Sequence, residues 1–521
     1  MSAPSRIIAK KQIDPDLPHH ASLVHMLRAA VELAPEVTAV VQEERRISYA
    51  EFGRAVNGLD ALLRQRGVDG GRVVIMMPNS IEMDVALMAA MSVGAQVAPV
   101  NPFFTTAELE KTLARVDAAA VICDAGSLGK AETIASAFGI ADPVCMASGH
   151  VDVGEWVGDA GLDGAPRSMP EADDPALLIF TGGSTGIPKG VDHSHRGLVW
   201  SLLQHCSVWP LEPAAERFLN VAPMFHIWGL TYATWVPVFA RSTLVMVPKY
   251  EPDKVIAGLS DHRITVFAGG PAPIYMGLLA SPAFDGADLS ALKYCLSGGA
   301  PCPEDLHREW LERTGCPLLE GWGMSEGAPF CLNPHDDERR LLSVGNPVPE
   351  TEVEVVDLDG GARVLPAGEA GEVRVRGPQL MERYFNNPEE TAQALRDGWL
   401  YTGDIGYVDS GFLYLVDRKK DMVLVGGFNV YPREVDELLF NHPKIREAAT
   451  VGKPDDRLGE VVVAFVVLDR GQHMEEDEFF AYCKESMVKY KRPVEVQFVS
   501  ALPKTRTNKI NRLALRGRLR H

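Results

Sequence analysis

The sequence has few cysteines, and none of them stands in an arrangement typical of a disulfide framework or a metal site. The eight cysteines, at positions 123, 145, 206, 295, 302, 316, 331 and 483, form no CxxC pair and have no histidine at metal-ligand spacing. In a chain of 521 residues, such thiols are typical of reduced cysteines in a reducing compartment. We therefore predict a cytoplasmic location.

A secretory leader and a membrane span are also missing from the pattern. The first residues, MSAPSRIIAKKQIDPD, contain no apolar stretch ahead of their charges, which argues against a signal peptide. The most apolar window, Val221–Ala240, is long enough for a span, but it contains Pro223, Gly229 and Pro237. We predict that this window lines a buried core and that the protein has no transmembrane segment.

Positive charge is scarce. The formal net charge is −19, which argues against a nucleic-acid partner, because such surfaces need a basic footprint. From Met422 onward, however, the balance is +3, and the end of the chain from Pro503 to His521 carries seven Lys and Arg residues and no acid. This basic end predicts either a solvated, acid-pairing tail or a mobile element that serves a polyanionic nucleotide.

Short apolar runs alternate with helical patterns through the first part of the chain. The run Val73–Met77 is followed by a helical pattern over Ile81–Val93 and another apolar run over Gln96–Val100. Such runs, separated by helices, are typical of parallel strands covered on both faces. Similar strands are predicted at Ala119–Cys123, Ala176–Phe180, Arg217–Ala222, Ser242–Val247, Val266–Ala268 and Tyr294–Ser297. The predicted fold class is α/β, with a large N-terminal domain of parallel α/β sheets.

The pattern changes near Leu341, and a chain of this length favours at least two domains. Alternating, glycine-punctuated segments predict a small β subdomain with strands at Thr351–Asp357, Glu372–Gly377 and Phe412–Val416. After them, we predict helices at Pro432–Asn441 and Glu475–Met487 and strands at Ala448–Val451 and Val461–Val467. The predicted domains are an N-terminal domain over 1–417, a hinge over 418–421 and a small, mobile α+β C-terminal domain over 422–521.

A glycine- and hydroxyl-rich segment, TGGSTGIPKG, follows the strand predicted at Ala176–Phe180. Glycines allow backbone amides to approach phosphate oxygens, and hydroxyl and lysine side chains add donors and charge. The segment does not match GxxxxGK[ST], because Ile187-Pro188 precede the lysine and a glycine follows it. We predict polyphosphate binding by Thr181, Gly182, Gly183, Ser184, Thr185, Gly186 and Lys189.

This segment resembles the phosphate loop of the adenylate-forming (AMP-binding) superfamily, which includes acyl-CoA synthetases, firefly luciferase and peptide-synthetase adenylation domains. Further motifs of the superfamily follow in order across residues 181–512, which makes the resemblance specific. GGAP resembles the turn beside the adenine, and GWGMSE resembles GYGxTE, with an indole as the flat face in place of tyrosine. The resemblance implies nucleotide binding by Gly298, Gly299, Ala300, Pro301, Gly321, Trp322, Gly323, Met324 and Ser325.

The charged residues of the site are also implied by the resemblance. Glu326 stands at the superfamily's Mg²⁺ ligand, Asp404 at the acceptor of the two ribose hydroxyls, and Arg418 near the ribose and phosphate. The segment PKTRTNKINR resembles PKTxxGKxxR, and Lys509 is its catalytic lysine. Asn508 departs from the usual glycine, but asparagine also tolerates left-handed backbone angles.

Two further segments concern the second half of the reaction. Lys420 stands at the superfamily's hinge position, where a change of backbone angles swings the small domain. The segment GGFNV resembles the loop that lines the pantetheine channel, which implies that Gly426, Gly427 and Phe428 contact CoA.

PMFHIWGL resembles the acid-pocket motif of acyl-CoA synthetases. It offers no aspartate of the FDxS type to hold an α-amine, so an amino acid is disfavoured. His226 stands at the gate between the acyl and thiol channels, and a satisfied core histidine is the alternative. The acyl pocket is expected from His226, Trp228, Tyr232, Gly269, Pro271, Ile274 and Met324, with no obvious lysine or arginine.

The predicted function is that of an ATP-dependent carboxylic acid–CoA ligase, which forms an acyl-adenylate and then a thioester, with Mg²⁺ as cofactor. A fatty or other apolar monocarboxylic acid is favoured. An aryl acid, a carrier-protein acceptor and a non-catalytic nucleotide-binding relative stay open, and the sequence is compatible with a homodimer. CoA is the favoured acceptor because no carrier domain follows Arg512.

Overall fold

The computed structural model describes residues 5–519, except 148–149, 167–168, 182–187, 301, 337 and 505–509. The chain divides into two compact units. Unit 1 comprises Met1–Ile7, Val353–Arg374 and Tyr401–His521, and unit 2 comprises Ile8–Glu352 and Val375–Leu400. The domain boundaries expected at residues 417 and 422 stay predictions.

Unit 2 contains a nine-stranded sheet whose centre is parallel. The parallel strands are β14, β13, β12, β10, β11 and β2, and antiparallel strands are added at both edges. In sheet order the strands are β16 (Asn346–Pro347), β15 (Gly327–Leu332), β14 (Leu318–Met324), β13 (Tyr294–Gly298), β12 (Val266–Gly270), β10 (Arg217–Asn220), β11 (Thr243–Met246), β2 (Thr38–Gln42) and β3 (Arg45–Ser48).

A seven-stranded sheet forms the other half of unit 2. Its strands, in order, are β19 (Arg383–Tyr384), β9 (Lys189–Ser194), β8 (Pro175–Thr181), β5 (Gln96–Pro99), β4 (Arg72–Met76), β6 (Ala120–Cys123) and β7 (Val144–Cys145). Strands β8 to β7 are parallel, while β9 and β19 add antiparallel strands at one edge. This edge carries the phosphate-loop segment.

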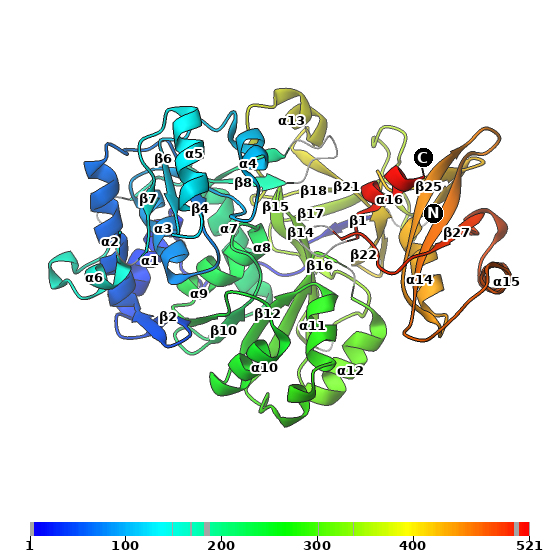
Figure 1. Ribbon diagram of the computed structural model, residues 1–521, viewed down its shortest axis with the longest axis horizontal. Coiled ribbons are helices and arrows are strands. Elements are labelled where there is room, and N and C mark those ends of the chain that lie inside the picture. The colour runs from blue at the N-terminus through cyan, green and yellow to red at the C-terminus, as the bar shows by residue number, and fades with distance from the viewer. Residues whose placement is uncertain are drawn as a thin grey trace. The chain divides into compact units, whose positions relative to one another are not determined.

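Helices cover both sheets of unit 2, as Figure 1 shows. Helices α4 and α5 pack on one face of the seven-stranded sheet, and α10, α11 and α12 pack on one face of the nine-stranded sheet. Helix α3 contacts β2 of one sheet and β4 and β5 of the other, and every one of its residues except Glu82 is buried. The helices of unit 2 are α1 (Leu23–Leu33), α2 (Tyr49–Gln65), α3 (Ile81–Ser92), α4 (Thr106–Leu113), α5 (Leu128–Phe138), α6 (Val153–Val157), α7 (His195–Val208), α8 (Ile227–Leu230), α9 (Val236–Phe239), α10 (Pro252–Asp261), α11 (Ala272–Leu279), α12 (Glu304–Thr314) and α13 (Pro388–Ala394), with short turns η1 (Ala160–Leu162), η2 (Thr231–Trp235) and η3 (Pro282–Gly286).

Local sequence explains where several of these helices begin. Ser48 caps α2 with its side chain, and Glu51 returns a bond to the cap, which completes a capping box. Thr105 and Glu108 form the same arrangement at α4. Pro252 stands at the first position of α10, where its missing amide hydrogen costs no hydrogen bond.

Unit 1 contains two smaller sheets. The first has the order β1 (Arg6–Ile8), β17 (Glu352–Val356), β18 (Gly371–Arg376), β21 (Trp399–Asp409) and β20 (Leu395–Arg396), with β22 (Phe412–Arg418) on β21; the whole of β20 and the ends of β1, β17, β18 and β21 belong to unit 2. The second has the order β24 (Phe428–Val430), β23 (Val423–Val425), β26 (Gly459–Leu468) and β25 (Ile445–Asp455), with β27 (Glu495–Phe498) on β26.

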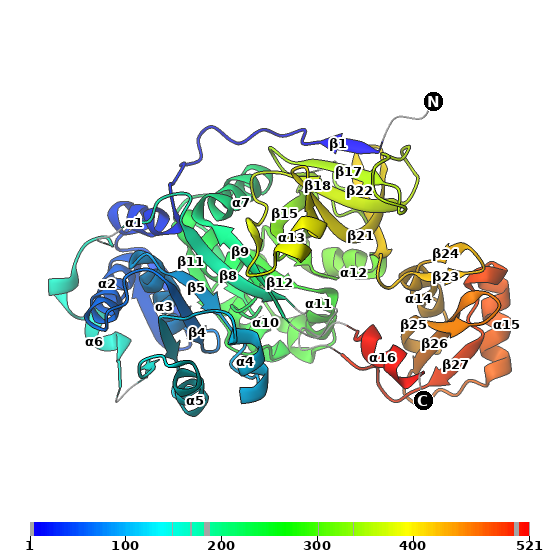
Figure 2. The same cartoon turned by 90° about the horizontal axis from the view of Figure 1, so that it is seen from above.

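Three helices cover the second sheet of unit 1, as can be followed in Figure 2. Helices α14 (Pro432–Phe440) and α15 (Glu476–Ser486) pack with one face of β26, and α16 (Arg512–Arg518) packs with the other face through Leu515. The turn η4 (Lys489–Lys491) precedes β27. The α/β fold class with a smaller α+β part is therefore confirmed, with antiparallel edge strands as an addition to the expected parallel sheets.

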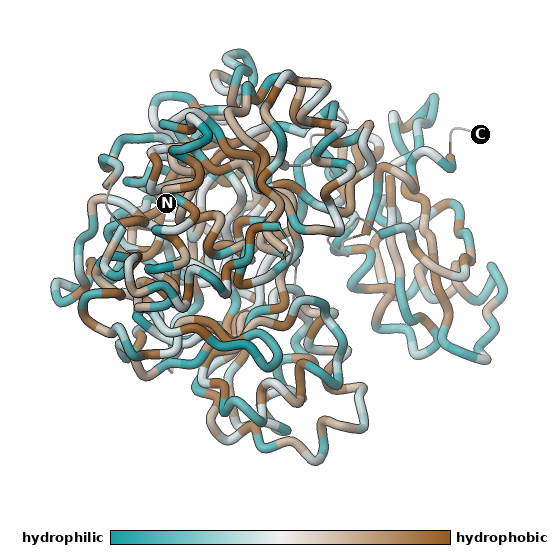
Figure 3. The backbone as a smooth tube through the Cα atoms, turned by 60° about the vertical axis from the view of Figure 1, so that its left-hand side comes forward, coloured by the Kyte–Doolittle hydropathy of each residue, from teal (hydrophilic) through white to brown (hydrophobic). Residues whose placement is uncertain are grey.

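The apolar residues lie inside each unit. In the hydropathy-coloured backbone of Figure 3, hydrophobic stretches run through the interior of each unit and hydrophilic stretches are frequent at its periphery. The eight cysteines are all buried and unpaired; Cys483 belongs to unit 1 and the other seven to unit 2. Among the described helices, none is long and apolar enough to cross a membrane. The window Val221–Ala240 contains the segment that follows β10, then α8, the π-helical turn η2 and α9.

Candidate active site

The phosphate-loop segment forms the end of the β8–β9 hairpin in unit 2. Thr181, the last residue of β8, pairs with Lys189, the first residue of β9. Apolar residues of β8 are buried, so the strand holds the hairpin in the sheet while its end reaches the surface. The tip lies outside the described residues, and with it lie Gly182, Gly183, Ser184, Thr185 and Gly186.

Lys189 lies in a charged and aromatic environment. Its Nζ forms an ion pair with Glu390 at 2.5 Å and stands 4.9 Å from the centroid of the Tyr384 ring. The side chain is only 18% exposed. The hairpin therefore places one lysine, paired with Glu390, beside the end of β8.

Tyr384 connects this hairpin to Glu326. Tyr384 lies in β19, which pairs with β9, and Val191 is its register partner there. The phenol hydroxyl donates to Glu326 Oε1 at 2.6 Å, and the Met381 amide donates to the Glu326 carbonyl at 2.8 Å. Glu326 is buried, so its carboxylate is held in one orientation next to the hairpin.

His193 makes a second connection between the same two segments. It lies on β9, and its Nε2 is 2.6 Å from the carbonyl oxygen of Ser325. Burial lowers the pKa of His193, so at neutral pH the ring is uncharged. Because a carbonyl only accepts, the neutral ring donates its Nε2–H to Ser325. The hairpin and the Ser325–Glu326 turn are thereby held together in unit 2.

The segments expected beside the adenine meet at the carboxyl ends of β13 and β14. These strands are parallel, and Gly298 is the register partner of Gly321. Gly299 has φ 77°, a left-handed angle that favours glycine, and begins the turn with Ala300. Pro301 lies outside the described residues.

The GWGMSE segment crosses from β14 into a tight turn toward β15. Trp322 is buried and packs edge-on against Phe330, with ring centroids 5.1 Å apart. A Cβ at Gly323 would come within 2.8 Å of Ala328, so only glycine fits this approach. Met324 ends β14 and pairs with Gly327 across the turn.

Trp228, expected in the acyl pocket, packs between Tyr232 and the ends of two strands of the nine-stranded sheet. Its indole lies 4.8 Å from the Tyr232 ring, and its Nε1 donates to the Ala268 carbonyl at 3.4 Å. A Cβ built on Gly298 would come within 2.5 Å of the indole, and one on Gly270 within 3.7 Å. The Trp228 indole therefore lies beside the carboxyl ends of β12 and β13, next to Gly270 and Gly298.

The other residues expected in the pocket lie nearby along the chain, in different settings. His226 stands immediately before α8 and its ring centroid is 5.0 Å from that of Phe225, while Pro271 stands immediately before α11. Ile274 is partly buried against the core and accepts a hydrogen bond from Tyr250 through its carbonyl. The Cβ direction of Gly269 faces the core rings Phe267 and Tyr275, whereas Gly270 faces Trp228.

Asp404 and Arg418 form a pair in unit 1. They are register partners on the antiparallel strands β21 and β22, and Arg418 Nε lies 2.5 Å from Asp404 Oδ1. Asp404 is buried, and its backbone amide donates to the hydroxyl oxygen of Thr402 at 3.0 Å. The pair expected at the ribose is thus brought together by strand register alone.

The remaining expected residues also belong to unit 1. Lys420 is exposed, and its carbonyl accepts from Arg516 at 3.1 Å. Gly426 and Gly427 both have positive φ and form the turn between β23 and β24, and Phe428 stacks on Tyr490 at 4.7 Å. Lys509 lies outside the described residues.

Three residues of the site were missed by the sequence reasoning. Tyr384, His193 and Gly270 lie outside every motif quoted above, although His193 follows the phosphate loop on the same strand. Their contacts depend on the pairing of β19 with β9 and on the face of the sheet toward which each residue is directed. A local sequence pattern reveals neither. In the part of the chain that the structure describes, no group of three or more His, Cys, Asp and Glu side chains gathers as a metal site.

Comparison with known proteins identifies the family. The model of the AMP-binding enzyme family matches residues 27–385, and the model of the AMP-binding enzyme C-terminal domain matches residues 434–509. The chain therefore belongs to the family of AMP-binding enzymes.

Relatives extend over nearly the whole chain. A long-chain-fatty-acid–CoA ligase of Bacillus subtilis (strain 168) is 33% identical, with 96% of each chain covered. A feruloyl-CoA synthase of Amycolatopsis sp is 35% identical, over 94% of this chain and 96% of the relative. The crystal structure of ATP-bound MatB from Rhodopseudomonas palustris superposes with a TM-score of 0.89 at 31% identity, over 96% and 99% of the two chains. The prediction of an AMP-forming acid–thiol ligase is confirmed.

Proposed function

We propose that this enzyme joins an apolar monocarboxylic acid to CoA through an enzyme-bound acyl-adenylate, with the residues named above in the roles given below. The observation that carries the proposal is the convergence of Lys189, Tyr384 and Glu326 at the end of the β8–β9 hairpin. A cation and a buried carboxylate next to a glycine-rich hairpin suit a polyphosphate with its metal ion.

In the first half-reaction the acid's carboxylate attacks the α-phosphorus of ATP. The acid is already ionised at neutral pH, so no general base is required. A bond forms between carboxylate oxygen and phosphorus, and the bond to pyrophosphate breaks. We assign charge neutralisation to Lys189 and Lys509, because the two reactants are both anions; catalysis is then mostly positioning and electrostatic stabilisation.

We assign Mg²⁺ binding to Glu326. The Tyr384 hydroxyl donates to Oε1 of Glu326 and fixes the plane of the carboxylate. A hard cation bound by one carboxylate takes its other ligands from phosphate oxygens and water. When bound, the ion would neutralise charge on the polyphosphate. Asp404 and Arg418 are assigned to the ribose and its phosphate, since a carboxylate accepts from two vicinal hydroxyls.

In the second half-reaction the CoA thiol attacks the adenylate carbonyl, a thioester forms and AMP leaves. We assign the thiol channel to Gly426, Gly427 and Phe428, and the swing that opens it to Lys420, with domains 1–417 and 422–521 on either side. His226 is assigned to the gate between acid and thiol. The buried, unpaired cysteines support a cytoplasmic location.

Trp228 and Tyr232 support an acid of moderate length. We assign their rings to one side of the pocket, and none of the seven residues expected there carries a permanent charge. An aryl acid is the second candidate, because two rings 4.8 Å apart also offer stacking faces to an aromatic substrate.

An acid panel tests the proposal. The enzyme is incubated with ATP, Mg²⁺, CoA and one acid at a time, and AMP and thioester are measured. We expect medium-length alkyl acids or aryl acids to react, and dicarboxylic and amino acids to fail. A preference for a dicarboxylate would contradict the apolar pocket, and the absence of ATP–pyrophosphate exchange with every acid would point to a non-catalytic relative.

Substitution of Trp228 makes the panel sharper. Trp228→Ala is expected to raise kcat/KM for long acids relative to short ones by about tenfold, since one methylene in an apolar pocket is worth about 1–3 kcal/mol. Met276→Ala is the matched control, because Met276 lies on α11 near Ile274 and is exposed. An unchanged length preference in Trp228→Ala would remove Trp228 from the pocket.

A further inference from the structure

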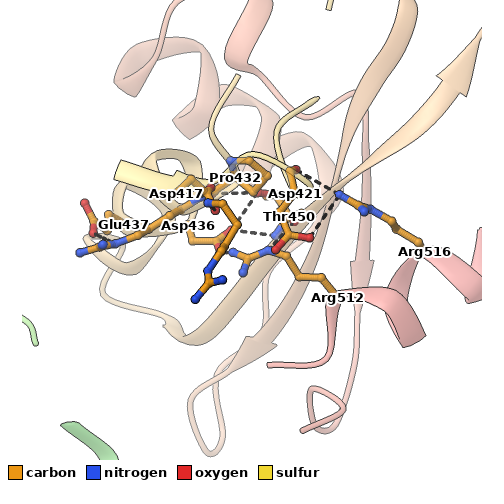
Figure 4. Close-up of polar contacts among 10 residues, drawn as sticks. Asp417, Asp421, Pro432, Asp436, Glu437, Thr450, Arg512 and Arg516 are labelled. Carbon is orange, nitrogen blue, oxygen red and sulfur yellow. Dashed lines mark hydrogen bonds and ion pairs between the residues drawn. The ribbon is translucent and has the colours of Figure 1, made fainter. Parts of the chain in front are cut away.

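A buried group of charged residues fastens the start of α16 in unit 1. Arg512 Nη2 forms an ion pair with Asp436 Oδ2, and its Nε donates to the Thr450 carbonyl at 3.2 Å. Asp436 Oδ1 accepts from both the amide and the hydroxyl of Thr450, at 2.7 and 2.8 Å. Figure 4 shows these side chains directed toward one another from α14, β25 and α16. We call Asp436, Thr450 and Arg512 the α16 anchor.

The α16 anchor is largely buried. Asp436 is 5% exposed and the Arg512 side chain 17%. The carboxylates of Asp436, Asp417 and Asp421 outweigh desolvation and raise the pKa of Arg512, so the guanidinium stays charged. A buried ion pair of this kind contributes little net stability compared with apolar packing, and its best-supported use is to fix one arrangement.

A second arginine fastens the same helix one turn later. Arg516 donates to the carbonyls of Lys420 and Asp421, both at 3.1 Å. Arg512 and Arg516 are four residues apart and therefore lie on the same face of α16. Around the same point, Asp417 accepts from the backbone amides of Arg418 and Arg433. The beginning of α16 is thus fixed relative to the segment 417–421.

The anchor comes immediately after the segment that carries Lys509. Lys504 and Ile510 form an isolated antiparallel bridge, and the Asn511 amide donates to the Pro503 carbonyl at 2.8 Å. Lys504 also pairs with Glu447 at 3.2 Å. The described residues on the two sides of 505–509 are therefore held together, and we call this pairing the stem. Arg512 is the first side chain after the stem with a buried partner among the described residues.

We propose that Arg512 is a positioning residue: its pair with Asp436 fixes the end of the stem and thereby places Lys509 for adenylate formation. The inference rests on the proposed function, because Lys509 is assigned there to neutralise the reacting anions. It acts in the first half-reaction, since Lys509 must be near the α-phosphate in that half only. Displacement of a catalytic group by about 1 Å can cost about 100-fold in rate.

The test separates the two half-reactions in the full-length enzyme. ATP–pyrophosphate exchange measures adenylation, and supplied acyl-adenylate with CoA measures thioester formation. For Arg512→Ala and Asp436→Asn we expect kcat of adenylation to fall by about 10- to 100-fold with KM for ATP changed less than threefold. Thioester formation is expected to stay within about twofold, and Arg512→Lys is expected to recover part of the adenylation rate.

Lys444→Ala is the matched control, because it breaks an ion pair with Glu478 in the same unit, at 2.6 Å, away from the stem. It is expected to leave both half-reactions unchanged. Circular dichroism and the melting midpoint are measured for every variant. Equal losses in both half-reactions, together with a lowered melting midpoint, would indicate a purely structural role and overturn the inference.

Lys509→Ala distinguishes this inference from the proposed function. If Lys509→Ala abolishes adenylation while Arg512→Ala does not slow it, the inference fails and the proposed function stands. If Lys509→Ala leaves adenylation intact, the assignment of Lys509 fails and the inference fails with it. In the double variant we expect no loss beyond that of Lys509→Ala, because the two residues act through one group.

Discussion

Asp84 is a buried carboxyl inside α3, the helix that lies between the two sheets of unit 2. It is 1% exposed, and Thr234 donates to its Oδ1 at 2.5 Å. Burial raises the pKa of Asp84 to about 8, so at neutral pH the folded protein holds this group protonated.

The consequence is a pH-dependent stability. In the unfolded chain the Asp84 carboxyl ionises near pH 4, whereas in the folded protein it stays neutral up to about pH 8. The contribution of this difference to the free energy of unfolding is therefore fully present below pH 4 and is lost as the pH rises toward about 8. Compared with Asp84→Asn, the parent is expected to lose about 1 kcal/mol of unfolding free energy per pH unit between pH 5 and pH 8. Melting midpoints of both proteins across this range check it, and parallel curves would contradict a protonated Asp84.

Tyr384 offers a test of the Glu326 assignment. Tyr384→Phe removes the hydroxyl that holds Oε1 of Glu326, a hydrogen bond to a charged group that is worth about 1.5–3 kcal/mol. We expect adenylation to slow by about tenfold and the Mg²⁺ concentration at half-maximal rate to increase. Titration of Mg²⁺ in the exchange assay measures both.

Tyr407→Phe is the control for this substitution, because Tyr407 stacks on Tyr414 in unit 1. A Tyr384→Phe enzyme with the parent's Mg²⁺ dependence would show that the hydroxyl does not orient a metal ligand.

At the residue scale, the sequence alone identified the candidate site residues that stand within short local motifs. Asp404 and Arg418 are 14 positions apart, yet β-strand register makes them partners, and both were identified from their own short motifs. Tyr384 could not be identified in this way, because its partner lies 58 positions earlier and the contact depends on β19 joining the sheet edge.

At the scale of single elements, the window Val221–Ala240 is the most unusual. It contains α8, a π-helical turn and α9 in immediate succession, and Gly229 is buried within it. A Cβ at Gly229 would come within 2.0 Å of the Pro223 carbonyl oxygen, which is backbone and cannot rotate away.

Gly229→Ala is therefore expected to destabilise the fold by about 3 kcal/mol or more, at the upper end of the cost of overpacking. Gly129→Ala, in α5, has open space around its Cβ and is expected to change stability by less than about 1 kcal/mol, in the stabilising direction. Chemical denaturation of the two variants beside the parent measures the difference, and similar midpoints for both would refute the close contact.

Two elements with strong hydrophobic patterns were predicted within one or two residues, whereas the strand expected at Ala448–Val451 extends over Ile445–Asp455 as β25. The helix expected at Ile81–Val93 is α3 (Ile81–Ser92), and the strand expected at Val461–Val467 is β26 (Gly459–Leu468). The edge strands β9 and β19 were not predicted, since β9 contains buried polar residues such as Asp192 and His193, and β19 has two residues only. Buried polar residues on a strand beside the candidate site interrupt the hydrophobic pattern from which strands are predicted.

At the scale of the whole molecule, the hinge proposed at Lys420 predicts that its substitution affects the two half-reactions differently. Lys420→Pro fixes φ near −65° and is expected to preserve adenylation within about threefold while thioester formation is lost by 100-fold or more. Lys420→Ala keeps the backbone free and is expected to retain both activities. The same pair of half-reaction assays measures them, and unimpaired thioester formation in Lys420→Pro would refute the hinge assignment.

The distribution of cysteines gives the protein an internal chemical reporter. Cys483 is the single cysteine of unit 1, and burial raises its pKa to about 12, so neither access nor thiolate is available in the native state. With a thiol-reactive reagent in rising denaturant, the modification of one thiol reports the opening of unit 1 and that of the other seven reports unit 2. The modified cysteines are identified by peptide mapping after brief labelling. If the two units unfold independently, Cys483 will be modified at a denaturant concentration different from that of the seven cysteines of unit 2. Simultaneous modification of all eight cysteines would mean that the enzyme unfolds as one cooperative body.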